Sequence, residues 1–227
     1  MRSLLRTPMM APLVRDSALV WLASGVVGVS FGAIAVAGGL PLWVPVAMSL
    51  VVYAGSAQFS AVGLLLAGGG PLAAVATGLI LNTRTAAFSL AVADVLGSGR
   101  FARLAGAHLV TDETVAFTLA QPDPARRRAA FWVNGLGLFA AWNTGVLAGA
   151  LAGTALGDTA TYGLDAAFPA VLVALVLPAL RTDRSVRRAA LLGAALALAV
   201  TPAVPAGVPV LLALAGLVVH RHNGGAA

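Results

Sequence analysis

The chain has 227 residues, of which 59% are hydrophobic and only 10% are charged, whereas a soluble domain usually carries roughly 25% charged residues. So few charged side chains exclude a water-soluble globule, and the absence of cysteine excludes disulfides and thiolate metal sites. The basic residues behind the net charge of +6 are all arginine and stand mostly in short gaps between apolar runs, which argues against a nucleic-acid-binding protein with one basic face.

Long apolar runs dominate the chain, and a helix needs about 20 such residues to cross a bilayer. The runs cover residues 18–37, 41–67, 71–96, 129–153, 162–180 and 189–219, with a weaker, more polar run at 104–121. None alternates with the period of two that barrel strands require. Since helices satisfy their own backbone hydrogen bonds in lipid, the sequence predicts an all-α integral membrane protein, a polytopic helix bundle.

The first run follows several arginines and ends in the small residues 35–37, as a cleaved signal peptide would. It is long for such a peptide, and further apolar runs follow at once, so we prefer a retained first span with a cytoplasmic N-terminus. The predicted organisation is a cytoplasmic N-terminal segment at 1–17, a single transmembrane transport domain at 18–221 and a short tail at 222–227.

Three long runs contain residues that break a helix or that place a polar or charged side chain at membrane depth. Gly55-Ser56 stands in the middle of the second run, Asn82 and Arg84 in the middle of the third. Several prolines divide the last run, which we expect to form two short helices joined by a turn. Because irregular backbone at membrane depth survives only inside protein or beside a cavity, these breaks predict an interior site.

The arginines also predict a topology, because they concentrate in cytoplasmic loops. The groups kept inside are Arg2/Arg6/Arg15, Arg126–Arg128, Arg181/Arg184/Arg187/Arg188 and Arg221. If three spans precede Gly97, the run 104–121 must cross back, which gives eight spans, or seven if the last run is one kinked helix. If 104–121 instead lies on the surface, the first half has an even number of spans. We prefer the crossing version, in which the halves meet near 100–128 and allow inverted repeats with broken helices.

The polar residues of the broken runs are the first candidates for a substrate site. Gly55 permits unwinding, and backbone N–H groups at the start of a half-helix can hold an anion. Ser56 and Gln58 add donors that fit a carboxylate, although a small-residue packing face with one buried amide explains them equally well.

Arg84, close to Asn82, is costly in mid-span unless it is paired or hydrated. Its planar fork could clamp a substrate carboxylate. It could equally pair with Asp94 or with an acid on another helix, or reach the membrane interface if the helix is offset. The sequence leaves these alternatives open.

Acidic residues in the weaker run are candidates for proton coupling. Asp112 and Glu113 lie in the segment that the preferred topology takes across the membrane, and a carboxylate removed from water binds protons more readily. His108 lies four residues before Asp112, which would place both on one helix face. The alternative is a re-entrant or surface helix with solvated acids.

Small residues and amides point to helix packing rather than chemistry. Gly145, Gly149 and Gly153 are spaced by four, and Gly28 and Gly32 repeat that spacing in the first span, which predicts close approach of neighbouring helices. Amides such as Asn134 more often join helices than bind ligands. No nucleotide-binding loop and no H-E-x-x-H motif is present, and Ser56 has no G-x-S-x-G context, so we expect no enzyme activity, no cofactor and no metal site.

At these residues the sequence resembles the AzlC-type permeases, the large subunits of branched-chain amino acid exporters (the LIV-E family). The matching segments follow in family order: Ser30–Gly32, Met48-Ser49 through Ala54–Phe59, Asn82-x-Arg84, Thr111–Phe117 and Leu164–Ala170, within roughly residues 20–180. The family often continues Asn-x-Arg with His and then Tyr, where this chain has Thr85 and Phe88; His108 could substitute for that His.

The resemblance implies proton-coupled export of branched-chain or similar neutral amino acids by a permease in the cytoplasmic membrane, together with a small, separately encoded AzlD-type membrane subunit. The resulting hypothesis gives the substrate carboxylate to Gly55–Gln58, Asn82 and Arg84, and the proton to Asp112 or Glu113. A channel and a non-transporting scaffold subunit remain as alternatives. An intramembrane enzyme ranks last, because no catalytic constellation is complete.

Overall fold

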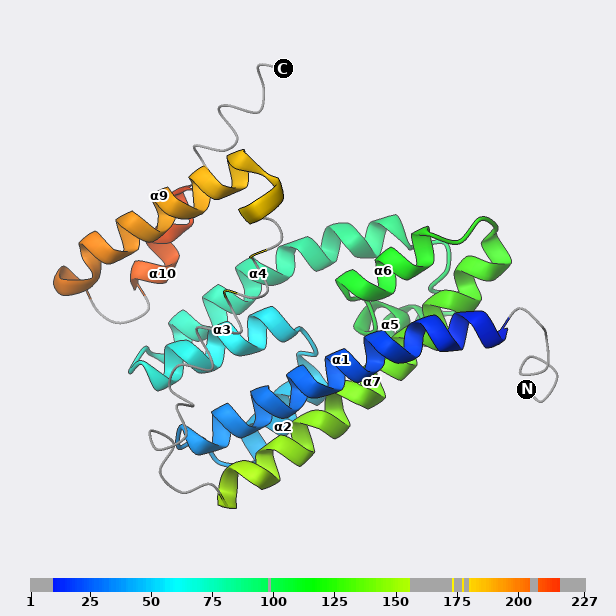
Figure 1. The fold of residues 1–227 in the computed structure, drawn as a ribbon, viewed down its shortest axis with the longest axis horizontal. Helices are drawn as coiled ribbons and strands as arrows, with labels where there is room; N and C mark the ends of the chain where they lie inside the picture. The colour runs from blue at the N-terminus through cyan, green and yellow to red at the C-terminus, as the bar shows by residue number, and fades with distance from the viewer. Residues whose placement is uncertain are drawn as a thin grey trace. The chain divides into compact units, whose positions relative to one another are not determined.

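The computed structural model describes residues 10–97, 99–155, 173, 177, 180–204 and 208–216. The part of the chain that it describes is helical and contains no strand, as predicted (Figure 1). Its helices are α1 (Met10–Ala37), α2 (Trp43–Val51), α3 (Gly55–Leu66), α4 (Pro71–Ala91), α5 (Arg100–His108), α6 (Asp112–Leu119), α7 (Pro124–Ala155), α9 (Arg184–Val200), a short 3-10 helix (Thr201–Ala203) and α10 (Val208–Ala213).

Three of the described helices are long and apolar enough to cross a membrane: Leu13–Ala37 within α1, Pro124–Ala155 and Arg184–Ala203. Helix α1 begins at Met10, which is before the start of the apolar run at residue 18. The expected total of seven or eight spans stays a prediction, because several runs are broken into shorter helices. The segment Leu164–Ala170 of the family resemblance, with most of the run 162–180, falls among the residues that are not described.

The internal contacts divide the chain into two units. Unit 1 comprises Met1–Gly55 and Asn82–Asp158, and unit 2 comprises Ser56–Leu81 and Thr159–Ala227, so that α4 passes from unit 2 to unit 1 at Asn82. The prediction of one transport domain over 18–221 stays a prediction.

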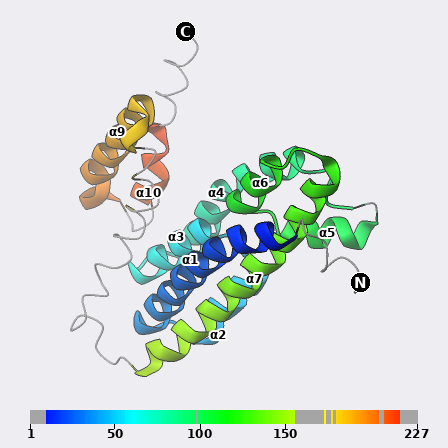
Figure 2. The same ribbon diagram turned by 45° about the vertical axis from the view of Figure 1, so that its right-hand side comes forward.

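Helices α1 and α7 form the core of unit 1 and lie side by side in both ribbon views (Figures 1 and 2). Their glycines face each other: a Cβ added at Gly28 would lie 2.7 Å from the Trp142 carbonyl oxygen. A Cβ at Gly149 would overlap the Val29 carbonyl oxygen. The prediction that the two glycine stripes bring helices close together is confirmed, because the stripe on α1 packs against the stripe on α7.

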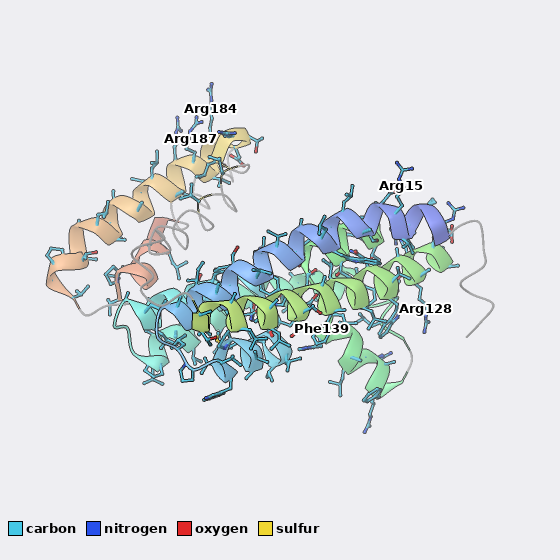
Figure 3. The ribbon with its side chains drawn as sticks, turned by 60° about the horizontal axis from the view of Figure 1, so that its bottom comes forward. Arg15, Arg128, Phe139, Arg184 and Arg187 are labelled. Atoms are coloured by element: carbon cyan, nitrogen blue, oxygen red, sulfur yellow. The ribbon has the colours of Figure 1, made fainter. Side chains whose placement is uncertain are left out.

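The two helices run in the same direction. Trp21 lies against Asn134, and further along both helices Gly32 lies against Val146. As a result Arg15 on α1 and Arg128 on α7 lie at the same end of the pair (Figure 3). This agrees with the expectation that these two arginine groups share one side of the membrane. If α1 and α7 both cross the membrane in the same direction, the chain between them must cross it an odd number of times. Both predicted topologies meet this condition.

The run 104–121 does not form one helix. Helix α5 ends at His108 and α6 begins at Asp112, so the expectation that these two residues share one helix face is wrong. The reason is a helix cap: Thr111 has extended backbone, and its side chain accepts a hydrogen bond of 3.2 Å from the Thr114 N–H. Asp112 and Glu113 then fill the first turn of α6, where negative charge is favourable.

In unit 2, α9 and α10 pack as an antiparallel hairpin. Gly193 of α9 lies against the Ala213 carbonyl group, and Gly216 lies against that of Ala189. Asp183 caps α9 by accepting a 2.7 Å hydrogen bond from the Ser185 N–H. The predicted pair of helices is present, and Pro202 lies in the 3-10 helix that follows α9. The expectation that both helices are short holds for α10 only, because Arg184–Ala203 is long enough to cross a membrane. Arg184 and Arg187 project from the first turn of α9 (Figure 3).

Candidate functional site

The predicted interruption of the second apolar run is present between α2 and α3. Helix α2 ends at Val51 and α3 begins at Gly55. The residue with unusual backbone is Tyr53, whose φ of 43° lies in the left-handed region that bulky residues rarely occupy. Gly55 is instead required for close packing, because a Cβ there would lie 3.2 Å from the Trp142 ring.

One turn of α7 supports this break from the side. The Phe139 ring meets the Tyr53 ring edge-on, with centroids 4.9 Å apart. One turn further along, the Ser49 hydroxyl donates a 2.7 Å hydrogen bond to the Asn143 side-chain oxygen. Strained backbone persists only where its surroundings hold it in place. The contacts of Phe139 and Asn143, together with the Trp142 ring between these residues on α7, hold the break in place. The break is therefore a fixed feature of unit 1.

His108, the last residue of α5, holds the break from another direction. Its Nε2 lies 2.9 Å from the Leu50 carbonyl oxygen, and because a carbonyl only accepts, Nε2 is the donor. Leu50 is in the last turn of α2, where carbonyl groups need partners from outside the helix. The imidazole centroid lies 5.7 Å from both Tyr53 and Phe139. Histidine and two aromatic rings thus form a cluster at the break.

A cavity of about 250 Å³ opens beside this cluster. Its α4 wall consists of positions i, i+3, i+4 and i+7, which share one helix face, and its other walls come from the break and from the end of α5. We call it the break pocket; it is lined by Val52, Tyr53, Ala54, Asn82, Thr85, Ala86, Ser89, Ala107, His108 and Val110. Half of these side chains are polar, and all lie in unit 1.

Arg84 has a protein partner. Its Nη1 lies 2.6 Å from Oδ2 of Asp112, and both side chains are about half exposed, at 48% and 47%. Of the alternatives that the sequence left open, an acid on another helix is the one found, rather than Asp94. Arg84 does not line the break pocket, although Asn82, two residues earlier on α4, does.

The remaining predicted residues are dispersed. Glu113 is exposed, and its backbone carbonyl accepts a 3.4 Å hydrogen bond from the Asn134 amide, whose oxygen accepts one of 3.1 Å from Trp21. Asn134 therefore joins α1, α6 and α7, as expected for a buried amide. Ser56 is half-buried and Gln58 fully buried in α3, both within unit 2.

The break pocket contains residues that sequence reasoning did not single out as binding residues. Tyr53 and Ser89 line it, and Phe139 packs behind Tyr53. Helical periodicity from Asn82 could have indicated Ser89, seven residues on along the same face. The aromatic cluster had no such signal, because its members come from three distant parts of the sequence.

Apolar helices long enough to span a bilayer, with a polar pocket at a helix break, define an α-helical integral membrane protein. The family model described as "AzlC protein" matches residues 20–156, which is more than half of the chain. The chain belongs to the AzlC family, a family associated with membrane transport. The match includes every residue of the break pocket and the Arg84–Asp112 pair. Comparison with curated proteins finds no match, and comparison with solved structures finds none either.

Proposed function

We propose that this chain is a secondary transporter that exports branched-chain or related neutral amino acids across the cytoplasmic membrane, coupled to protons. Its N-terminus lies in the cytoplasm, and it works with a small AzlD-type membrane subunit. Family membership supports transport, and the break pocket is the observation that supports a small-molecule substrate. Transporters commonly bind substrate where a helix is interrupted inside the membrane.

The size and lining of the break pocket suit an amino acid. Its volume of about 250 Å³ lies below the roughly 300–1,000 Å³ typical of pockets for drug-sized ligands. Asn82 offers both a donor and an acceptor, so its amide can serve the carboxylate or the ammonium group of a zwitterion. Val52 and Val110 supply apolar surface for a branched side chain.

The Arg84–Asp112 pair offers a way to couple substrate and proton. Arg84 can bind a substrate carboxylate only by loosening its 2.6 Å contact with Asp112. The ammonium group of the substrate can replace the guanidinium beside Asp112, and it binds that carboxylate only while the carboxylate is ionised. Substrate and proton would therefore compete for Asp112, as export in exchange for an inward-moving proton requires, and such coupling is reciprocal. Glu113 and His108 are the further candidates for carrying the proton.

Efflux from cells tests the proposal. Cells that express this chain with its small partner would be loaded with an isoleucine- or valine-containing dipeptide, and release of the free amino acid would be followed. We expect saturable, gradient-dependent release that Arg84→Ala abolishes while membrane insertion is retained. The matched control is Arg100→Ala, since Arg100 is also an exposed arginine of unit 1 but is not the partner of Asp112.

The other outcomes separate the rival functions. Release that does not saturate and ignores the gradient would indicate a channel. No release with both subunits inserted would indicate a scaffold or a different substrate. Full release by Arg84→Ala would remove that residue from the site.

A further inference from the structure

The polar side chains of the break pocket are distributed along it rather than gathered at one end. Asn82, Thr85 and Ser89 line it from α4, where each residue adds about 1.5 Å, so Thr85 lies about 4.5 Å and Ser89 about 10.5 Å beyond Asn82 along the axis. An amino acid needs polar partners for its amino and carboxylate groups, which are close together. A purely aliphatic side chain would leave the second polar position unused.

Two hydrogen-bonding atoms of the pocket lining are available to a polar side chain of the substrate. Ser89 donates its hydroxyl proton to the Thr85 backbone carbonyl at 2.9 Å, so this proton is used within α4. The Thr85 hydroxyl, by contrast, makes no hydrogen bond with any of the residues that the structure describes. On the α5 wall, Nε2 of His108 is engaged by the Leu50 carbonyl, which leaves Nδ1 of the neutral ring as an acceptor.

We propose that the break pocket selects a neutral amino acid with a hydroxyl group at its branched β-carbon, as in threonine, over the aliphatic isostere valine. Thr85 is the specificity-determining residue and His108 its second partner. The inference rests on the proposed function and narrows its substrate class. With the α-carbon of the substrate level with Asn82, the β-substituents lie toward Thr85, about one helical turn along α4.

The physical basis is the loss of hydrogen bonds when valine binds. A methyl group at this position shields the Thr85 hydroxyl and His108 Nδ1 from solvent and returns no hydrogen bond to either. A hydroxyl group can accept a hydrogen bond from Thr85 and donate one to His108 Nδ1. Sites built to hydrogen-bond a substrate hydroxyl discriminate strongly against the analogue that lacks it, whereas an apolar slot discriminates weakly between the two.

Relative transport of threonine and valine by the complete two-subunit complex is the test. Both amino acids would be supplied together, and the ratio of their transport efficiencies would be measured. Thr85→Val removes the hydroxyl at constant volume, and we expect it to lower the threonine-to-valine ratio by roughly three- to tenfold. Thr83→Val is the matched control, because it makes the same change on the same helix at a residue that does not line the pocket.

A second pair of variants covers the case in which Thr85→Val does not insert. Thr85→Ser keeps the hydroxyl and should keep the ratio, whereas Thr85→Ala should lower it. A wild-type ratio that favours valine, or a ratio that the loss of the hydroxyl leaves unchanged, would overturn the inference and leave the proposed function standing. Transport of neither amino acid by the wild type would overturn both.

Discussion

Close packing of α1 on α7 predicts that a single methyl group at Gly32 destabilises unit 1. A Cβ there would overlap the Val146 carbonyl oxygen and lie 2.7 Å from the Ala150 backbone nitrogen, about 0.7 Å closer than the 3.4 Å of ordinary contact. Both obstacles are backbone atoms, so the helices themselves must move apart. Overpacking of this kind costs about 1–3 kcal/mol, and we expect Gly32→Ala to cost about 2 kcal/mol.

Gly78→Ala provides a matched control with a different expected result. It also adds one methyl group inside a helix, but the nearest neighbour, the Ala57 Cβ, would be 4.0 Å away within unit 2. Alanine is the better helix former by up to about 1 kcal/mol, so this variant should be neutral or slightly stabilised.

Thermal unfolding of the purified protein in detergent, followed by tryptophan fluorescence, measures both changes. For a chain of this length, about 2 kcal/mol corresponds to a midpoint roughly 4–8 °C lower. Equal midpoints for Gly32→Ala and wild type would refute the packing argument. So would an equal loss in the two variants, because the added volume is the same in both.

Two further predictions concern the site. His108→Leu removes the donor to the Leu50 carbonyl and should cost about 1 kcal/mol, whereas His108→Gln keeps an N–H donor and should cost less; equal unfolding midpoints would show that this hydrogen bond contributes nothing. Arg84→Asp and Asp112→Arg should each lower the unfolding midpoint, and the double exchange should restore it by rebuilding the ion pair, yet transport should stay lost because the cation has left α4. Recovery of transport by the exchanged pair would mean that the ion pair is only structural.

Features that depend on local sequence were predictable. Glycines spaced by four anticipated the α1–α7 contact, and the prolines after residue 200 anticipated the hairpin of unit 2. Gly55-Ser56 located the interrupted helix within a few residues. In each case the side-chain spacing or the backbone preference of one short segment decides the outcome.

Features that depend on distant partners were not predictable. Glycine is the expected residue at an unwound turn, yet Tyr53 takes that conformation because Phe139 and Trp142 of α7 decide where a ring fits and where only glycine fits. The partner of Arg84 lies 28 residues away, and its position depends on the fold of α5 and the turns around it. The separation of His108 from Asp112 had a local signal, the Thr111 cap, which the apolar pattern of the run obscured.

The absence of cysteine allows a single thiol to report whether substrate occupies the break pocket. Ala86→Cys places it in the pocket wall, and Ala125→Cys places it in the exposed first turn of α7 as a control. The rate of labelling by a membrane-permeant maleimide would be measured in variants that still transport. At a substrate concentration ten times the Kd, labelling at position 86 should slow about tenfold, while position 125 should not respond. An unchanged rate at position 86 under saturating substrate would contradict a substrate site at the α2–α3 break.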